Sequence, residues 1–320
     1  MDKFNKILPT ALVWRSRGDL VAIATVTETW GSSPRPVGSQ MIINSKGEIL
    51  GSVSGGCVEG AVIEEAMYCI KTGKSLSLSY NVNDEDAFAA KLTCGGSIKI
   101  LIQSIDACFS LDTLRALVLK IDSNEAVGYV VDNSSTENQL ILADSEYSES
   151  LDSGSGFINN KFFVVYPLPL KMLIIGGVHI AQFLSQFASV SGFDVTVIDP
   201  RPVFVSKTRF PDIKVMNVWP DEALKSLELN DRTAVVTLSH DPKIDDLALL
   251  IGLNSSCFYI GCLGSAATHQ KRLERFKNKG YSRSSLKRLH GPIGLSINAD
   301  TKVEIAGSIM GEIIKVLRKK

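Results

Sequence analysis

The sequence predicts an α/β protein with two domains. The first is an α/β domain over residues 1–167, and the second is a Rossmann-like domain over residues 168–320, whose parallel sheet has helices on both faces. The chain has 320 residues, about two domains of roughly 150 residues each. Its second half alternates apolar strand-like runs with helical segments, as in β-α-β units. Between the halves stands Pro167-Leu168-Pro169, a stiff connector that suits neither a helix interior nor a central strand.

The composition excludes several classes of protein. Apolar residues make up 45% and charged residues 21% of the chain, which is typical of a globular protein. Lysine plus arginine equals aspartate plus glutamate at 34 each, so no overall charge favours nucleic acid or anionic lipid as a partner. Six cysteines without a C-x-x-C pair suit a reducing compartment. The charged N-terminus predicts neither a signal peptide nor a membrane anchor, so we expect a cytoplasmic protein.

The N-terminal half combines helices with short strands. Apolar spacing from Ile7 to Arg17 predicts a helix that ends at Gly18, and the apolar run from Leu20 to Val26 predicts a buried strand. Similar patterns predict strands at residues 40–43, 49–53, 76–82, 97–105, 127–131, 139–142 and 162–166, and helices at residues 57–72 and 111–121. Residues 133–138 and 145–156 are rich in polar side chains and predict solvated loops.

The C-terminal half alternates strands and helices. We expect strands at residues 171–175, 194–198, 213–216, 233–238 and 257–260, with helices after Gly177 and from Asp221 and Ile244. The uncharged run 247–268 is interrupted by Asn254-Ser255-Ser256, so it predicts a helix end and a buried strand and not a membrane helix. The last helix starts at Asp300 or Thr301, because Thr301 and Glu304 have the spacing of a capping box. Its expected apolar stripe is Val303, Ala306, Met310 and Ile313.

The turn after the strand at 171–175 partly matches a dinucleotide-binding motif. It reads Gly176-Gly177-Val178-His179-Ile180-Ala181. In G-x-G-x-x-G/A the glycines let a pyrophosphate reach free amides at a helix N-terminus. Gly176 and Ala181 fit the first and third positions, but Val178 stands where the second glycine is expected. The branched side chain should weaken dinucleotide binding.

An acidic residue follows at the expected distance. Asp199 ends the second strand about 20 residues later, as an acid that binds the NAD ribose would, whereas Arg201 could meet the 2′-phosphate of NADP. Gly176, Gly177 and Asp199 are therefore candidates for binding NAD(P). The alternative is a Rossmann scaffold that has lost or altered its ligand.

Three more loops follow strands in this half, where ligands bind in open α/β sheets. They are residues 239–246, 261–265 and 290–295. Ser265 can cap the following helix and, with Gly264, leave amides free for an anion. Three loop histidines could transfer protons or bind a metal, although a loop histidine is more often an ordinary hydrogen-bonding residue. They are His240, His269 and His290.

The N-terminal half contains a glycine- and serine-rich loop, Gly51 to Gly60, that runs into a predicted helix. Its candidate anion-binding residues are Ser52, Ser54, Gly55 and Gly56. Cys57 follows at the helix start, where the dipole favours a thiolate that could also bind metal. Cys94 with Gly95 forms a second candidate, and Arg35 between two prolines could meet a phosphate or carboxylate.

The alternative for Cys57 and Cys94 is that both are small buried residues in tight turns. The other four cysteines lie on apolar patterns and are predicted to be core residues. These are Cys69, Cys108, Cys257 and Cys262.

Several of these segments, taken in order, resemble the XdhC/CoxI family of xanthine dehydrogenase accessory factors. The resemblance implies a cytoplasmic, dimeric protein that is a chaperone more than an enzyme, with an N-terminal XdhC/CoxI domain and a C-terminal Rossmann domain. Val178 departs from it, since relatives tend to have Gly-Ala-Gly-His at this turn. The matching segments are residues 31–41, 51–59, 92–96, 176–181, 197–201, 239–246, 261–265 with 268–269, and 290–295.

The resemblance also implies a cofactor and partners. A family member binds molybdenum cofactor, supports its sulfuration by a cysteine desulfurase, and delivers it to a molybdenum hydroxylase such as xanthine dehydrogenase. Molybdopterin carries a phosphate and a dithiolene, so a binder needs anion-binding groups and a sheltered pocket. Two alternatives remain open: an NAD(P)-binding oxidoreductase or nucleotide sensor, and an interaction scaffold without either ligand.

Overall fold

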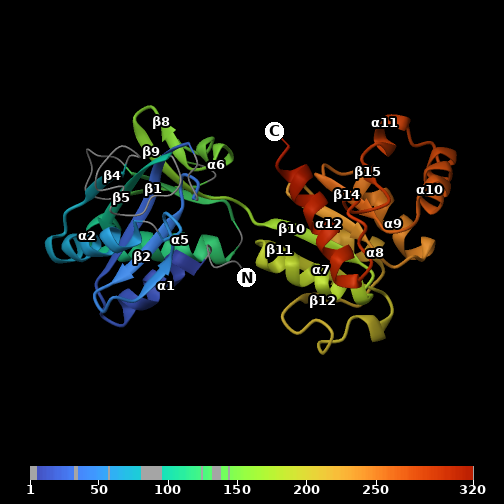
Figure 1. Cartoon of the computed structure of the whole chain (residues 1–320), viewed down its shortest axis with the longest axis horizontal. Coiled ribbons are helices and arrows are strands. Elements are labelled where there is room, and N and C mark those ends of the chain that lie inside the picture. The colour runs from blue at the N-terminus through green and yellow to red at the C-terminus, as the bar shows by residue number, and fades with distance from the viewer. Residues whose placement is uncertain are drawn as a thin grey trace. The chain divides into compact units, whose positions relative to one another are not determined.

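The computed structural model describes residues 6–31, 35–56, 58–80, 96–123, 125–131, 138–142 and 145–319. The chain forms two compact units, Lys3–Leu168 and Pro169–Lys320. Each unit has hydrophobic cores of its own, and the two are described separately (Figure 1). Among the described residues, no helix is long and apolar enough to cross a membrane.

The first unit is built on a five-stranded antiparallel sheet with the order β3-β2-β1-β5-β4. One face packs on α2, where Ala66 and Cys69 contact strand residues such as Ile100. Gly73, with φ +69°, ends this helix in the left-handed conformation that glycine adopts without strain. The bounds are β1 Val21–Gly31, β2 Gln40–Asn44, β3 Ile49–Gly51, α2 Glu59–Thr72, β4 Leu76–Tyr80 and β5 Gly96–Ser104.

The opposite face of this sheet packs on helices and on a second sheet. Ile23 and Ile42 contact α1 and α5, while Tyr129 and Val164 come from an antiparallel sheet with the order β7-β6-β9-β8. Tyr129 is buried in this layer, and its hydroxyl accepts a hydrogen bond of 2.8 Å from Gln40 Nε2. The bounds are α1 Ile7–Ser16, α4 Ile105–Cys108, α5 Leu111–Asp122, β6 Val127–Val131, β7 Gln139–Ile141, α6 Ser150–Ser153, β8 Gly156–Ile158 and β9 Lys161–Tyr166.

The second unit is a parallel sheet with the order β12-β11-β10-β13-β14-β15, as the sequence predicts. The strand order reverses between β10 and β13. In such sheets, ligands bind beyond the carboxyl ends of the strands on either side of this reversal. The strand bounds are β10 Leu170–Ile175, β11 Phe193–Ile198, β12 Lys214–Met216, β13 Thr233–Thr237, β14 Tyr259–Cys262 and β15 Leu289–His290.

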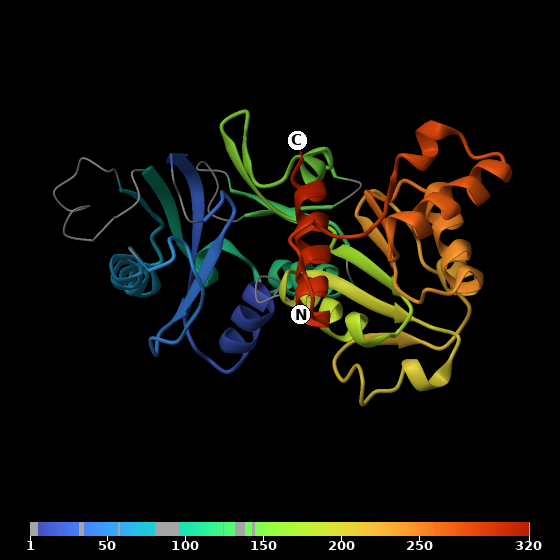
Figure 2. The same ribbon diagram turned by 45° about the vertical axis from the view of Figure 1, so that its right-hand side comes forward.

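Helices cover both faces of this sheet. Successive residues of a strand point to opposite faces, so each face of this buried sheet presents apolar side chains that a layer of helices covers. Met172 and Ile174 pack with α7 and α12, which lie side by side in Figures 1 and 2. Leu173 and Ile175 pack with α8, α9 and α10. The helix bounds are α7 His179–Val190, η2 Pro202–Phe204, α8 Pro220–Ser226, α9 Pro242–Leu253, α10 Ala266–Asn278, α11 Arg283–Leu286 and α12 Lys302–Leu317.

Several details test the sequence predictions. The capping box of Thr301 and Glu304 is confirmed at the start of α12. The predicted apolar stripe is wrong at Val303, which is exposed, because the first turn of this helix extends beyond the core. Residues 145–156 contain α6 and the buried Leu151, so this segment is not purely a solvated loop. The four cysteines predicted as core are all buried: Cys69, Cys108, Cys257 and Cys262.

Candidate functional site

The turn after β10 approaches the loop after β13 at the point where the strand order reverses. Gly176 has φ +100°, and a Cβ at this position would lie 2.7 Å from the backbone nitrogen of Ser239. A larger residue would therefore push the two loops apart. Gly176 therefore allows the turn after β10 and the loop after β13 to pack closely against each other.

Asp199 directly follows β11 and is fully buried. Its Oδ2 accepts hydrogen bonds from the Gly177 amide at 2.9 Å and from Arg201 Nη2 at 2.8 Å. Its Oδ1 accepts from the Arg201 amide and Nε, both at 2.9 Å. Burial raises the pKa of Asp199, but these hydrogen bonds outweigh it and lower the pKa below the usual value. The carboxylate is already satisfied by its own chain.

The segment after β11 packs on Gly177 of the same turn. A Cβ on Gly177 would lie 2.2 Å from the carbonyl oxygen of Phe204, and Arg209 Nη2 donates to the Gly177 carbonyl at 2.8 Å. The Arg201 guanidinium lies 4.2 Å from the Phe204 ring centroid. Val178 packs against the hydrophobic core beside the sheet. Residues 201–209 thus pack directly on Gly177 of this turn.

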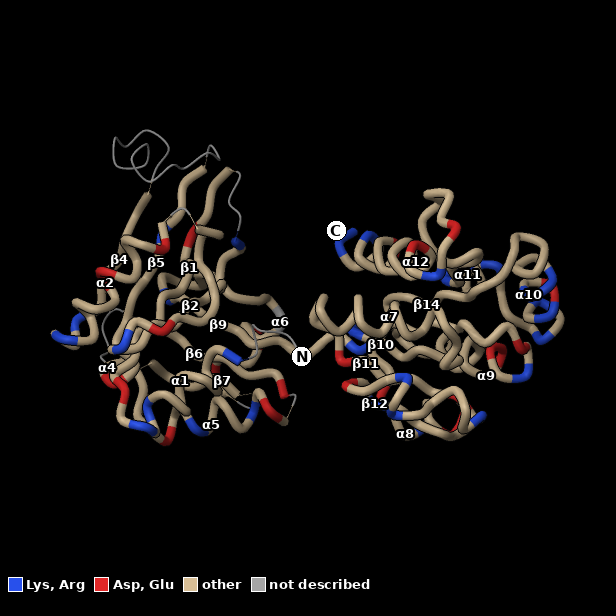
Figure 3. Tube along the Cα trace, turned by 60° about the horizontal axis from the view of Figure 1, so that its bottom comes forward, with Lys and Arg blue, Asp and Glu red and all other residues tan. Residues whose placement is uncertain are grey.

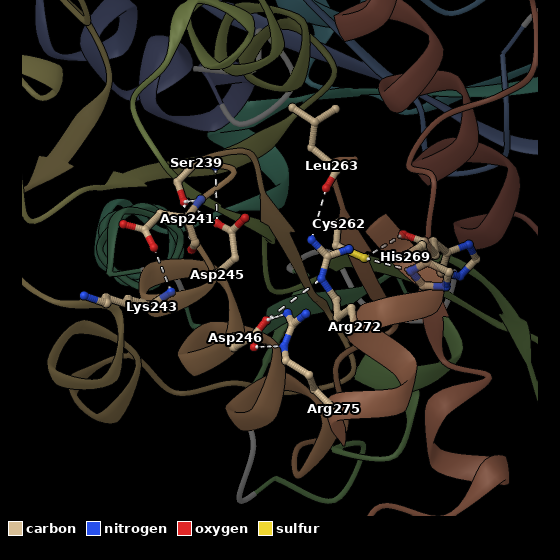
Figure 4. Close-up of polar contacts among 11 residues, drawn as sticks. Ser239, Asp241, Lys243, Asp245, Asp246, Cys262, Leu263, His269, Arg272 and Arg275 are labelled. Carbon is tan, nitrogen blue, oxygen red and sulfur yellow. Dashed lines mark hydrogen bonds and ion pairs between the residues drawn. The ribbon is translucent and has the colours of Figure 1, made fainter. Parts of the chain in front are cut away.

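Charged residues of α9 and α10 form a network beside the loops after β13 and β14, drawn in Figure 4. Asp245 Oδ1 accepts from the Ser239 hydroxyl at 2.6 Å, and burial raises the pKa of Asp245. Asp246 forms two hydrogen bonds with Arg275, at 3.0 and 2.9 Å. Arg272 lies between Asp246 and Cys262 in the figure and donates from Nη2 to the Leu263 carbonyl at 3.1 Å.

Two histidines lie near Cys262 at the carboxyl ends of β14 and β15. His269 Nδ1 is 3.6 Å from Cys262 Sγ, and the His290 carbonyl accepts from the same sulfur at 3.5 Å. Burial, and secondarily the charge of Arg272, lowers the pKa of His269. Burial raises the pKa of the Cys262 thiol to about 11, which keeps it protonated and unreactive at neutral pH.

Gly264 and Ser265 form the turn that begins α10. Ser265 caps the helix by accepting from the Thr268 amide at 3.2 Å, which confirms the predicted cap. Gly264 has φ +144°, a conformation that favours glycine. Whether this turn binds an anion stays a prediction.

In the N-terminal unit, the glycine- and serine-rich loop closes on a carboxylate of its own chain. Glu59 Oε1 accepts from the Ser52 hydroxyl at 2.8 Å and from the Ser54 and Gly55 amides, both at 2.9 Å. Its Oε2 accepts from the Ser54 hydroxyl and from the Gly56 amide at 2.7 Å. Burial raises the pKa of Glu59, but these bonds outweigh it and lower the pKa to about 2.

The loop is therefore an anion-binding nest, as the sequence predicts for its donors, but the anion it holds is Glu59. The remaining N-terminal candidates are less fully described. Arg35 is half-buried in the segment before β2. Cys57, Cys94 and Gly95 lie outside the described residues. No three metal-ligating side chains lie close enough together to hold a metal ion in the described part of the chain.

Several charged residues of these sites are absent from the sequence predictions, among them Glu59, Arg272 and Glu312, whose Oε1 lies 3.3 Å from His290 Nδ1. A signal was available for Glu59, since a glutamate at the first turn after a Ser-Gly-Gly loop suits helix-terminal amides. Arg272 and Glu312 sit within helical patterns that look like solvated faces in the sequence. Only the folded structure brings them beside β14 and β15.

Two family models match the chain. Residues 172–313 match the XdhC Rossmann domain, and residues 14–81 match the XdhC and CoxI family. The first match coincides with the parallel sheet and its helices. The second runs from the last residues of α1 to the end of β4 and includes the Glu59 loop.

Known proteins are similar over almost the whole chain. The molybdenum cofactor insertion chaperone PaoD of Escherichia coli (strain K12) is 26% identical over 98% of this chain and 89% of its own. A probable xanthine dehydrogenase component of Bacillus subtilis (strain 168) is 26% identical over 93% of each chain. The crystal structure of a xanthine dehydrogenase from Bacillus halodurans has the same fold, with a TM-score of 0.81 and 24% identity over 100% of this chain and 97% of that one. The chain belongs to the XdhC and CoxI family.

Proposed function

We propose that the protein is a molybdenum cofactor insertion chaperone that serves a molybdenum hydroxylase such as xanthine dehydrogenase. The observation that carries this proposal is the similarity to PaoD across both units, over 98% of the chain. A likeness confined to the Rossmann unit would support only a common scaffold. The likeness of the N-terminal unit is what favours cofactor handling.

The finer parts of the proposal concern the cargo and the partners. The chain would receive molybdenum cofactor, support its sulfuration by a cysteine desulfurase, and act as a cytoplasmic homodimer. A phosphate and two sulfur atoms make the cofactor anionic and easily oxidised, so a carrier needs a cation and a sheltered site. Arg35, Cys57, and Cys94 with Gly95 are the residues we assign to it.

The hydrogen bonds to Glu59 change the function that we assign to the glycine- and serine-rich loop. Its amides and hydroxyls already bind a carboxylate, so a cofactor phosphate would have to displace Glu59 to use them. We therefore assign to Ser52, Ser54, Gly55 and Gly56 the task of fixing the chain next to Cys57. Arg35 then supplies the positive charge.

The nicotinamide alternative has weaker support in the geometry. The Asp199 carboxylate accepts four hydrogen bonds from Gly177 and Arg201, and the Phe204 backbone packs on Gly177. An NAD ribose or pyrophosphate would have to break these contacts before binding. No contact in the described residues favours an oxidoreductase.

Titration of the purified protein with molybdopterin and with NAD⁺ and NADP⁺ tests the proposal. We expect molybdopterin to bind, and Arg35→Ala and Cys57→Ala each to weaken its affinity about tenfold, the loss of one charge-assisted contact. Cys257→Ser, a thiol change in the other unit, should leave the affinity unaltered. Full affinity in both the Arg35 and Cys57 variants would refute the assigned residues. Saturable NAD⁺ or NADP⁺ binding without molybdopterin binding would refute the proposed function.

A further inference from the structure

Charge is distributed unevenly along this chain, although its formal net charge is zero. Residues 1–168 contain 20 acidic and 13 basic side chains, whereas residues 169–320 contain 14 acidic and 21 basic ones. The two halves therefore carry formal net charges of −7 and +7 at neutral pH. The overall balance excludes a field of one sign around the whole protein, but it permits two local surfaces of opposite sign.

The positive charge is concentrated in one segment of the second unit. Residues 271–288 contain eight basic side chains and a single acidic one, Glu274. They form most of α10, the turn that follows it, and α11, and Figure 3 shows the basic residues along α10. Five of them are exposed and form no ion pair with a described residue; we call them the basic surface: Lys271, Lys277, Lys279, Arg283 and Lys287.

The other three basic residues of this segment have contacts that stabilise the fold. Arg275 forms two hydrogen bonds with Asp246, and Arg288 donates to three backbone carbonyl oxygens between residues 253 and 257. Arg272 is buried. The basic surface has no such contacts, and its like charges repel one another, which costs stability. Its charges therefore point to an acidic partner and not to a role in folding.

The surface suits a protein better than a membrane or a nucleic acid. Between Trp219 and Ile297, where every residue is described, no large hydrophobic side chain is exposed. The apolar residues of α10, Leu273 and Phe276, pack in the core. Helices that lie on membranes need an exposed apolar face to insert. A nucleic acid would be repelled by the negative charge of the first half of the chain.

The matching negative charge lies in the first unit. Residues 121–160 contain eight acidic side chains and no lysine, arginine or histidine. Four of these acids are described and exposed, and only one of the four, Glu125, forms an ion pair with a described residue, 2.6 Å from Lys120. We call the four the acidic surface: Asp122, Glu125, Glu146 and Glu149.

Strand pairing brings these acids together. Because β6 and β7 are antiparallel neighbours, the chain that enters β6 and the chain that leaves β7 lie at the same end of the sheet. Asp122 and Glu125 precede β6, and Glu146 and Glu149 follow β7. The acids therefore gather on the segments that adjoin this end of the sheet.

We propose that the protein forms a salt-sensitive, two-fold symmetric dimer in which the basic surface of each copy docks on the acidic surface of the other. One chain carries both surfaces, so two copies make the same contact twice and the assembly is closed. Opposite charges speed the encounter and set the relative orientation of the copies. The inference rests on the homodimer of the proposed function and names the surfaces that form it.

Sedimentation equilibrium of the full chain at increasing NaCl concentration tests the proposal without any substitution. We expect a dimer at about 50 mM NaCl, with a dissociation constant that rises at least about tenfold by about 500 mM, because salt screens exposed charges. A chain that stays monomeric at about 50 mM NaCl and roughly 50 μM protein would overturn the proposal. A dimer whose dissociation constant does not respond to salt would also overturn it.

Charge reversal identifies the two surfaces. The first variant reverses three charges of the basic surface: Lys271→Glu, Lys277→Glu and Arg283→Glu. The second variant reverses three charges of the acidic surface: Asp122→Lys, Glu146→Lys and Glu149→Lys. All six positions are exposed and form no ion pair with a described residue, so we expect both variants to fold.

Each variant alone should be monomeric where the native protein is dimeric, because like charges then meet at both contacts. An equal mixture of the two should form a heterodimer, because each reversed surface then meets a surface of opposite charge. Unchanged dimerisation of either folded variant, or a mixture that stays monomeric, would overturn the proposal.

A matched control reverses three exposed lysines outside both surfaces and should dimerise as the native protein does: Lys71→Glu, Lys74→Glu and Lys214→Glu. It has the same net charge as the basic-surface variant, so loss of its dimer would show that net charge and not the basic surface is responsible, and would overturn the proposal. A monomer that binds molybdopterin would refute this inference alone. A salt-sensitive dimer that binds no molybdopterin would refute the proposed cofactor function alone.

Discussion

Replacing Glu59 with glutamine is expected to lower the free energy of unfolding of the N-terminal unit by about 2 kcal/mol, discounted for partial exposure. The carboxylate accepts five hydrogen bonds from Ser52, Ser54, Gly55 and Gly56. Glutamine has one oxygen in place of two, and its amide group would face donors at the Oε2 position. Chemical denaturation of the variant and the native protein measures the difference.

The same interaction predicts a pH dependence. The pKa of Glu59 is about 2 in the folded protein, below its ordinary value of 4.5. A lowered pKa stabilises the folded state at pH values above the unfolded pKa, and that contribution is lost as the pH falls toward 2. The difference between native protein and Glu59→Gln should therefore shrink between about pH 5 and pH 2.

A matched control is available on the same helix. Glu64 is exposed on α2, and Glu64→Gln should change the unfolding free energy by less than about 0.5 kcal/mol. If Glu59→Gln were as stable as Glu64→Gln at neutral pH, the hydrogen bonds of Glu59 would not stabilise the Gly51–Gly60 loop.

Replacing Asp199 with asparagine is expected to cost about 3 kcal/mol of unfolding free energy in the C-terminal unit. The variant leaves the Arg201 guanidinium without its buried counter-charge and places an amide group against the Gly177 amide or Arg201. Denaturation of this unit, followed by a probe specific to it, measures the loss.

This variant also separates a structural acid from a ribose-binding one. Asp194→Asn, at an exposed position in the same strand, should be nearly neutral. A ribose-binding Asp199 would give the opposite pattern, with stability close to that of Asp194→Asn and a loss of NAD⁺ affinity. That pattern would contradict the interpretation that the carboxylate serves its own chain.

Most strands of the C-terminal unit could be predicted from sequence because they are short, largely apolar runs. The predicted 171–175 and 194–198 differ from β10 and β11 by one residue at the N-terminal end. By contrast, β15 has two residues, too few for any periodicity, and becomes a strand only by pairing with β14. For this reason the sequence alone does not predict β15.

The candidate site could be predicted only in part. Strand ends identified the loops at residues 239–246, 261–265 and 290–295, because ligand-binding loops follow parallel strands. The partners of those loops come from elsewhere: Glu312 is 22 residues beyond His290 on a helix, and its role depends on how α12 packs. Similarly, donors in the Gly51–Gly60 loop predict that an anion binds, but not that Glu59 is that anion.

Transfer of the cofactor to an enzyme tests the central claim most directly. Cofactor-free xanthine dehydrogenase would be incubated with molybdenum cofactor in the presence and absence of this protein, and the recovered hydroxylase activity measured. The chaperone function predicts faster and more complete recovery with the native protein, and a smaller gain with Arg35→Ala. Recovery that is the same with and without the native protein, while the protein binds no cofactor, would contradict it.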